Sequence, residues 1–278
     1  MEDQTLGLTL DMGFDFDQYD PRKLPPLSPG EDEKWYSKFY YAGRKEVDPE
    51  MAELFAPGRR MDPEWALLPG QFDRLMEPGH LEGDLGYCLL PNGVGYGSAC
   101  TRLDQVPFSM FQWYKQRKRK EALAYQIWYP GSHVSEFDHT PIEDIGFGPE
   151  AILPHSSVNW EQLGMSCAPE ARDPEFLAIM GGNGIIESAV PGRETTPRVM
   201  CLFHYVRRLP SGGSEFRTHF YIGMHIERGR GVVKQQIEPA LCLEATRRML
   251  SHCIHERENL AAFLPEFYEA EHDVPEED

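Results

Sequence analysis

The alternation of apolar and polar residues predicts a series of antiparallel strands that begins near residue 83. Residues 85–90 and 94–100 are rich in apolar side chains and flank Pro91-Asn92-Gly93, whose Asn-Gly pair favours a tight hairpin turn. Four later segments alternate in the same way, and the loop 210–214 joins the last two as a second hairpin: residues 123–129, 156–162, 198–209 and 215–226. Because strands do not alternate regularly with helices, the sequence indicates an antiparallel sheet.

Helical periodicity occurs twice in the same region. Residues 107–118 begin with proline and end in basic side chains, which suits the two ends of a helix. Residues 238–263 form the longest helical pattern, with an apolar stripe at a period of 3.6 residues. A curved antiparallel sheet around this long helix predicts an α+β domain over residues 83–268.

The flanking segments differ from this domain in composition. Residues 1–82 combine an acidic, proline-rich arm with short helical pieces at 50–55, 63–68 and 72–76, broken by proline and glycine. Aromatic residues gather at 35–40, which favours an arm that packs on a second copy of the chain in a homodimer. Residues 269–278 are acidic, and we expect a solvated tail there.

Composition and charge exclude several classes of function. The 278 residues include 27 basic and 45 acidic side chains, and the net charge of −18 disfavours a nucleic-acid partner. The chain lacks an apolar run of about 18 residues and a signal peptide, so we expect a cytoplasmic protein without a membrane partner. The six cysteines are scattered without a Cys-x-x-Cys pair, and we expect reduced packing residues, not a disulfide frame or a thiolate zinc site.

Two chemically capable residues lie inside the apolar stripe of the long helix. His252 and Glu256 are four residues apart, so their side chains stack on one helix face. A buried carboxylate requires a partner, because an unpaired one is costly in the interior. A hydrogen-bonded core pair and a metal-binding pair both satisfy this requirement, and two ligands alone do not make a site.

Two further candidates come from the middle of the chain. His133 ends the run Trp128-Tyr-Pro-Gly-Ser-His133, just after the predicted strand 123–129, where an exposed loop histidine is the alternative to a ligand. Glu161 falls in the predicted strand 156–162, and a solvent-facing glutamate is the alternative there.

A histidine and a polar row are candidates for proton transfer and binding. His204 shares its expected strand face with apolar residues, so a core histidine and a catalytic histidine both remain open. The next strand places four polar side chains on one face: Glu215, Arg217, His219 and Tyr221. Pairing of the two strands is expected to bring this row beside His204 as the wall of a polar cavity, unless the row faces solvent.

Four segments of the chain together resemble the diacetylphloroglucinol hydrolase and phloretin hydrolase family: residues 124–133, 203–207, 220–223 and 251–265. The resemblance covers about residues 83–268, and its most specific parts are Tyr-x-Ile-Trp-x-Pro-x-x-His and His-x-x-x-Glu. It implies a Bet v 1-like helix-grip domain with a small helical N-terminal part. It also implies a zinc-dependent hydrolase that cleaves the carbon–carbon bond between a polyhydroxylated aromatic ring and an acyl carbonyl.

The resemblance also assigns roles to individual residues. The zinc ligands it implies are His133, Glu161, His252 and Glu256, with Glu150 as the competitor for the position of Glu161. We expect Tyr125 and His204 to transfer protons, Glu215 to orient His204 or a phenolic hydroxyl, and Tyr221 to bind one of the hydroxyls. The partner is a small acylated phenol. A metal-free aromatic-ligand-binding protein and a metal-free polyketide cyclase are the alternatives.

Overall fold

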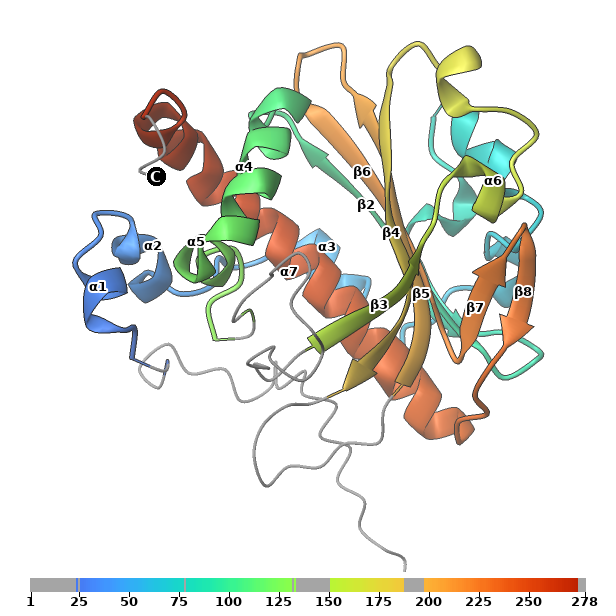
Figure 1. Ribbon diagram of the computed structural model, residues 1–278. Helices are drawn as coiled ribbons and strands as arrows, with labels where there is room; N and C mark the ends of the chain where they lie inside the picture. Colours follow the sequence, from blue (N-terminus) through green and yellow to red (C-terminus); the bar gives the residue numbers. More distant parts are fainter. Residues whose placement is uncertain are drawn as a thin grey trace, which may run out of the picture.

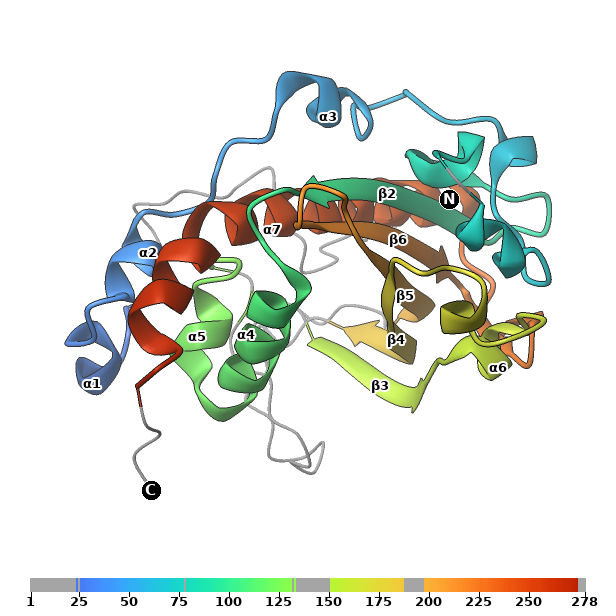
Figure 2. The ribbon, with the colours of Figure 1, turned by 90° about the horizontal axis from the view of Figure 1, so that it is seen from above.

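One antiparallel sheet, covered on both faces, organises the molecule (Figures 1 and 2). The computed structural model describes residues 24, 26–77, 79–131, 133, 151–187 and 198–274. The predicted α+β class is confirmed, and the described residues contain no helix long and apolar enough to cross a membrane.

The sheet has six strands in the order β1-β2-β6-β5-β4-β3, with every neighbouring pair antiparallel. Their bounds are β1 Gly86–Leu89, β2 Gly95–Leu103, β3 Ala151–Ser157, β4 Phe176–Glu187, β5 Arg198–Arg208 and β6 Ser214–Ile222. A small hairpin, β7 Met224–Glu227 and β8 Arg230–Val233, continues the chain after β6. Both predicted hairpins are confirmed: β1 pairs with β2, and β5 pairs with β6.

The long helix α7, Pro239–Glu271, crosses one face of the sheet diagonally in Figure 1. The Glu238 side chain caps its first turn by accepting from the Leu241 N–H at 2.9 Å. Close approach of α7 to β2 requires Gly95, where an added Cβ would lie 2.0 Å from Thr246 Oγ1; Gly97 makes room instead for the ring of Phe220 on β6, at 2.1 Å. The helix runs past its predicted end at residue 263.

Two further helices, α4 Phe108–Lys120 and α5 Ala122–Gln126, pack on the C-terminal half of α7. Tyr114 lies edge-on to Phe263 with ring centroids 5.5 Å apart, and to Trp128 at 5.9 Å. Arm residues Tyr36 and Phe39 contact Phe267 and Phe263 of the same chain. The homodimer therefore stays a prediction, since these aromatic side chains already have partners within the chain.

The described N-terminal segment supplies six short helices, of which the last three cover the second face of the sheet and the first three pack on the α7 side. It contains α1 Pro29–Asp32, α2 Ser37–Tyr41, α3 Pro49–Glu53, η3 Pro63–Trp65, η4 Phe72–Met76 and η5 Glu82–Asp84. Leu67, Phe72 and Leu75 pack with Phe203 and Tyr221 of the sheet in one buried cluster. The sheet is thus buried between α7 on one face and η3, η4 and η5 on the other, which is why its strands have few exposed side chains. The division at residues 82 and 83 stays a prediction.

Two predicted strands are wrong. Residues 123–129 form α5 and the turn after it, and the buried positions Leu123, Ala124, Ile127 and Trp128 have the spacing of a helix. In residues 156–162, β3 ends at Ser157 and helix α6, Trp160–Leu163, follows. Two local signals explain α6: the Asn159 side chain accepts from the Gln162 N–H at 2.9 Å, and Gly164 ends the helix in the left-handed conformation.

Candidate metal and active site

Three buried side chains from two distant parts of the chain meet beside α7. His252 and Glu256 lie one turn apart on the helix, and His133 follows the turn after α5. The Nε2 atoms of His252 and His133 lie 3.4 Å and 3.7 Å from the same Glu256 oxygen, Oε2. The potential ligand atoms of all three residues lie within 4.8 Å of one another. We call this group the His–His–Glu triad.

Aromatic packing fixes the position of His133. Its ring stacks on that of Tyr125 with centroids 4.2 Å apart and an interplanar angle of 3°, and Trp128 lies edge-on at 5.2 Å. The indole N–H of Trp128 donates to the backbone carbonyl of Glu256 at 2.9 Å. This bond holds the α5 turn on α7, so His133 is a buried residue of the site and not an exposed loop histidine.

The protonation states in the triad suit metal binding. Burial, followed by the neighbouring His252, holds the pKa of His133 well below its ordinary value, so its imidazole is neutral. Burial alone would raise the pKa of Glu256, but Arg257, His252 and His133 outweigh it and lower that pKa. A neutral imidazole and an ionised carboxylate are the forms that coordinate zinc.

The donor set of the triad fits a catalytic zinc site. Two imidazoles and one carboxylate are a three-ligand set that leaves a fourth position for water or substrate. The buried Nδ1 of His133 has no hydrogen-bond partner among the described residues.

Arg257 links the triad to His204. It is 1% exposed, and its Nη2 lies 3.2 Å from Glu256 Oε1 and 3.1 Å from His204 Nε2. A guanidinium only donates, so His204 Nε2 is the acceptor, and the proton on Nδ1 is donated to Thr218 Oγ1 at 2.8 Å. Burial, followed by Arg257, holds the pKa of His204 well below its ordinary value. His204 is thus a neutral imidazole bonded to side chains, not to a backbone carbonyl.

Two buried cations border the site, and the sequence analysis missed both. The Nε and Nη1 groups of Arg257 have no hydrogen-bond acceptor among the described residues. Lys118, at the end of α4, is 5% exposed, with Nζ 5.0 Å from the centroid of the Tyr125 ring and 4.9 Å from that of Trp128. The one available signal is the basic run 115–120 just before the Tyr125 motif.

Glu161 lies away from the triad. It is an exposed residue of α6, which packs beside β7, and both Figure 1 and Figure 2 place α6 and α5 on opposite sides of the molecule. The backbone of the same helix is held there by a bond from Gly229 N–H to Gln162 O at 2.8 Å. The predicted strand position of Glu161 is therefore wrong, and its competitor Glu150 lies outside the described residues.

Glu215 and Tyr221 are not beside His204. His204 is paired with Thr218 in the sheet, and directly paired residues share a face, so Glu215 and Tyr221 point to the opposite face. There the Tyr221 hydroxyl donates to the Leu67 carbonyl at 2.5 Å, and Glu215 accepts from Arg217. The predicted cavity wall and its solvent-facing alternative are both wrong, since the short N-terminal helices bury this polar row.

Comparison with known proteins connects most of the chain to one family. The family model described as DAPG hydrolase PhiG domain matches residues 68–269, a span that includes the entire His–His–Glu triad. A curated relative from Pseudomonas sp., 2,4-diacetylphloroglucinol hydrolase, shares 24% identity over a 220-residue alignment. That alignment covers 70% of this chain and 74% of the relative.

Proposed function

Because the chain belongs to the DAPG hydrolase PhiG domain family, and is thereby a hydrolase of carbon–carbon bonds in ketonic substrates, we propose that it is zinc-dependent and acts on acylated phenols. The bond cleaved joins a polyhydroxylated aromatic ring to an acyl carbonyl, and the products are a phenol and a carboxylic acid. The observation that carries this proposal is the convergence of His133, His252 and Glu256 beside Tyr125 and His204. We also propose a Bet v 1-like helix-grip fold, because a long helix lies on one face of an antiparallel sheet.

The triad is the proposed zinc site. His133 Nε2, His252 Nε2 and a Glu256 oxygen would hold the ion, and the fourth ligand position would be open to water or substrate. A zinc ion bound there supplies Lewis acidity, which polarises the acyl carbonyl or lowers the pKa of water.

Proton transfer belongs to Tyr125 and His204. Hydrolysis adds hydroxide from water to the acyl carbon and a proton to the ring carbon, while the electrons of the broken bond move into the ring. The ring accepts them when it is in a keto form, in which the departing carbon lies beside a carbonyl. Trp128 contacts Tyr125 on one side and Arg257 on the other, and Arg257 in turn contacts the neutral His204. In this proposal, Tyr125 and His204 move protons between the ring oxygens and that carbon.

Arg257 and Lys118 stabilise negative charge on the ring oxygens. Cleavage converts the ring to an enolate, and a buried cation is most effective where such charge develops. Arg257 offers two N–H groups without an acceptor among the described residues, and the Lys118 ammonium lies 5.0 Å from the centroid of the Tyr125 ring. A ring that lacks these hydroxyls develops no negative charge on ring oxygens, so neither cation would stabilise it.

Substrates with and without free ring hydroxyls test the proposal. Purified protein is incubated with phloretin, monoacetylphloroglucinol, diacetylphloroglucinol and the permethylated ether of each, and the carboxylic acid is quantified by chromatography. We expect acid from the free phenols and none from the ethers, because methylation removes the keto tautomer and leaves the acyl carbonyl intact. Equal cleavage of both forms would remove the roles of Tyr125 and His204, and cleavage of neither would reject the substrate class.

A further inference from the structure

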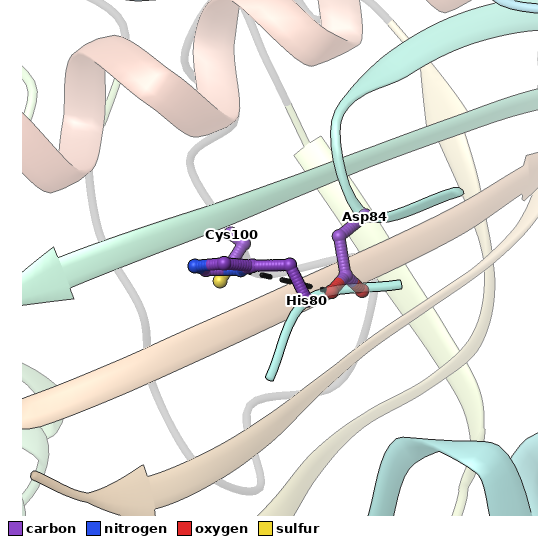
Figure 3. Close-up of side chains that lie close together, drawn as sticks. All are labelled: His80, Asp84 and Cys100. Atoms are coloured by element: carbon purple, nitrogen blue, oxygen red, sulfur yellow. Dashed lines mark ion pairs between the residues drawn. The ribbon is translucent and has the colours of Figure 1, made fainter. Parts of the chain in front are cut away.

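We propose that the opposite face of the sheet carries a second metal site, in which His80, Asp84 and Cys100 bind a zinc ion (Figure 3). We call these residues the His–Asp–Cys cluster. It is separate from the His–His–Glu triad, and it does not depend on the proposed function.

The cluster joins two parts of the fold. His80 and Asp84 belong to the segment that ends in η5, and Cys100 is a residue of β2 whose side chain points to the same face as Arg217. The ligand atoms lie within 4.8 Å of one another, and His80 Nδ1 is 4.0 Å from Asp84 Oδ2. Ligand atoms around a tetrahedral zinc ion are about 3.5 Å apart. His80 is exposed, so a small rotation of its side chain can close the difference.

Charge and hydrogen bonding around Asp84 favour a cation. The buried neighbours include two carboxylates, Asp84 and Glu215, but one guanidinium, that of Arg217, with Nε 3.8 Å and 3.3 Å from their oxygens. One negative charge is thus left without a compensating cation in the interior.

Beside the cluster, one buried polar atom of Asp84 and one of His219 face each other without a hydrogen bond. Asp84 Oδ1 lies 3.8 Å from His219 Nε2, which is too long for a hydrogen bond, and neither atom has another partner among the described residues. Asp84 is 1% exposed and His219 is 0% exposed, so water does not satisfy them from the surface. A metal ion on Asp84 would satisfy the carboxylate and neutralise the excess charge.

The ligand chemistry favours zinc over calcium and magnesium. One sulfur, one imidazole nitrogen and one carboxylate oxygen suit zinc, whereas calcium and magnesium prefer oxygen ligands only. The Cys100 thiol loses its proton to solvent when the metal–sulfur bond forms, which makes binding weaker at low pH. A bound ion would connect the N-terminal segment to β2 and stabilise the folded chain.

Cobalt(II) provides a spectroscopic test, because a thiolate ligand to cobalt gives a charge-transfer band in the near ultraviolet and a site without sulfur does not. Full-length protein is freed of metal with a chelator and titrated with cobalt chloride, with bound metal measured by elemental analysis. We expect the band in the parent protein, its loss in both Cys100→Ser and His80→Ala with one fewer bound metal per chain, and its retention in His252→Ala.

The exposed histidines make the result interpretable. His80→Ala removes an exposed ligand and preserves the core, whereas Cys100→Ser alters a buried position, so loss of the band in the former cannot result from unfolding. His272→Ala, at the end of α7, is the matched control and should leave the band unchanged. Absence of the band in the parent protein, or its persistence in His80→Ala, would overturn this site. If instead the His–His–Glu triad does not bind zinc, His252→Ala will contain as much metal as the parent protein.

Discussion

Arg257 contacts both Glu256, a proposed metal ligand, and His204, a proposed proton carrier. Its Nη2 donates to Glu256 and His204 at the same time, and its guanidinium lies over the rings of Trp128 and Phe216 at 5.3 Å and 4.8 Å. Lysine has a single charged nitrogen and lacks the planar fork that can reach several acceptors at fixed angles. The geometry therefore requires arginine at this position.

Replacement of Arg257 should impair turnover more than folding. In Arg257→Met we expect kcat to fall by roughly 10²-fold or more, because a buried donor to developing negative charge is lost. Arg257→Lys should recover only part of this loss. Steady-state kinetics and circular dichroism measure the two effects, with Arg248→Met as the control on the same helix, since Arg248 bonds Glu244. An unchanged kcat in Arg257→Met would remove the arginine from the mechanism.

Tyr125 and His204 should be separable from metal binding. We expect Tyr125→Phe and His204→Gln to keep their metal and their fold but to lose roughly 10²-fold or more in kcat, because proton transfer is impaired. Elemental analysis and steady-state kinetics on the same preparations test this. A variant with parental turnover would require another residue as proton carrier.

His252 and His255 form a matched pair on α7. His252 belongs to the triad, whereas His255 Nδ1 lies 2.8 Å from the Ser251 carbonyl one turn back. We expect His252→Ala to lose one metal ion per chain together with the activity, and His255→Ala to retain both. Metal content and product formation are measured for each variant. Equal metal content in the two variants would contradict the proposed zinc ligands.

At the scale of elements, the tight contact between α7 and β2 depends on glycine. A side chain at Gly95 would meet Thr246 Oγ1 at 2.0 Å, and relief of such a clash displaces the helix or the strand. We expect Gly95→Ala to lower the free energy of unfolding by about 1–3 kcal/mol in urea denaturation. Gly30→Ala, where an added Cβ meets nothing within 4 Å, is the control and should change stability little. If the Gly95→Ala protein were as stable as the parent, the helix and the strand would have to move apart without a cost in stability.

Local patterns predicted the elements that have turn signals or a long helical period, and failed for short segments and for the choice of sheet face. The hairpin at Asn92-Gly93 and the long helix follow from turn chemistry and periodicity, and both are confirmed. Residues 123–129 alternate over too short a length to exclude a helix, and in the folded chain residues 122–126 form the helix α5 because tertiary packing favours it. In β6 both faces are buried, so alternation could not tell which of them meets His204.

The site shows the same limit. His252 and Glu256 follow from their spacing within one helix, because helical geometry fixes their relative position. His133 required a resemblance, since no local rule relates it to a helix more than a hundred residues later. The burial of Lys118 and Arg257 depends on how α4, α5 and α7 pack together, which their own segments do not encode.

At the scale of the whole molecule, the triad connects the α5 turn to α7, so metal binding should stabilise the entire fold. A ligand that binds only the folded state at about 100 times its Kd adds about 2.7 kcal/mol to the free energy of unfolding. We therefore expect the Tm measured by calorimetry to fall on chelation and to recover with zinc. His252→Ala should show a smaller shift, because one of the three triad ligands is gone. A parental Tm that chelation does not change would contradict the coupling.

The position of α7 in the sequence also sets the order of events during synthesis. His133 leaves the ribosome well before His252 and Glu256, and the sheet face that α7 covers has no partner until the last helix is made. A nascent chain cut before residue 239 therefore has one ligand of the triad and an uncovered apolar face, so it cannot complete the triad and exposes the kind of surface that chaperones bind. If the triad binds the proposed zinc, it can do so only after α7 has been made, so a triad-bound ion would mark a finished chain.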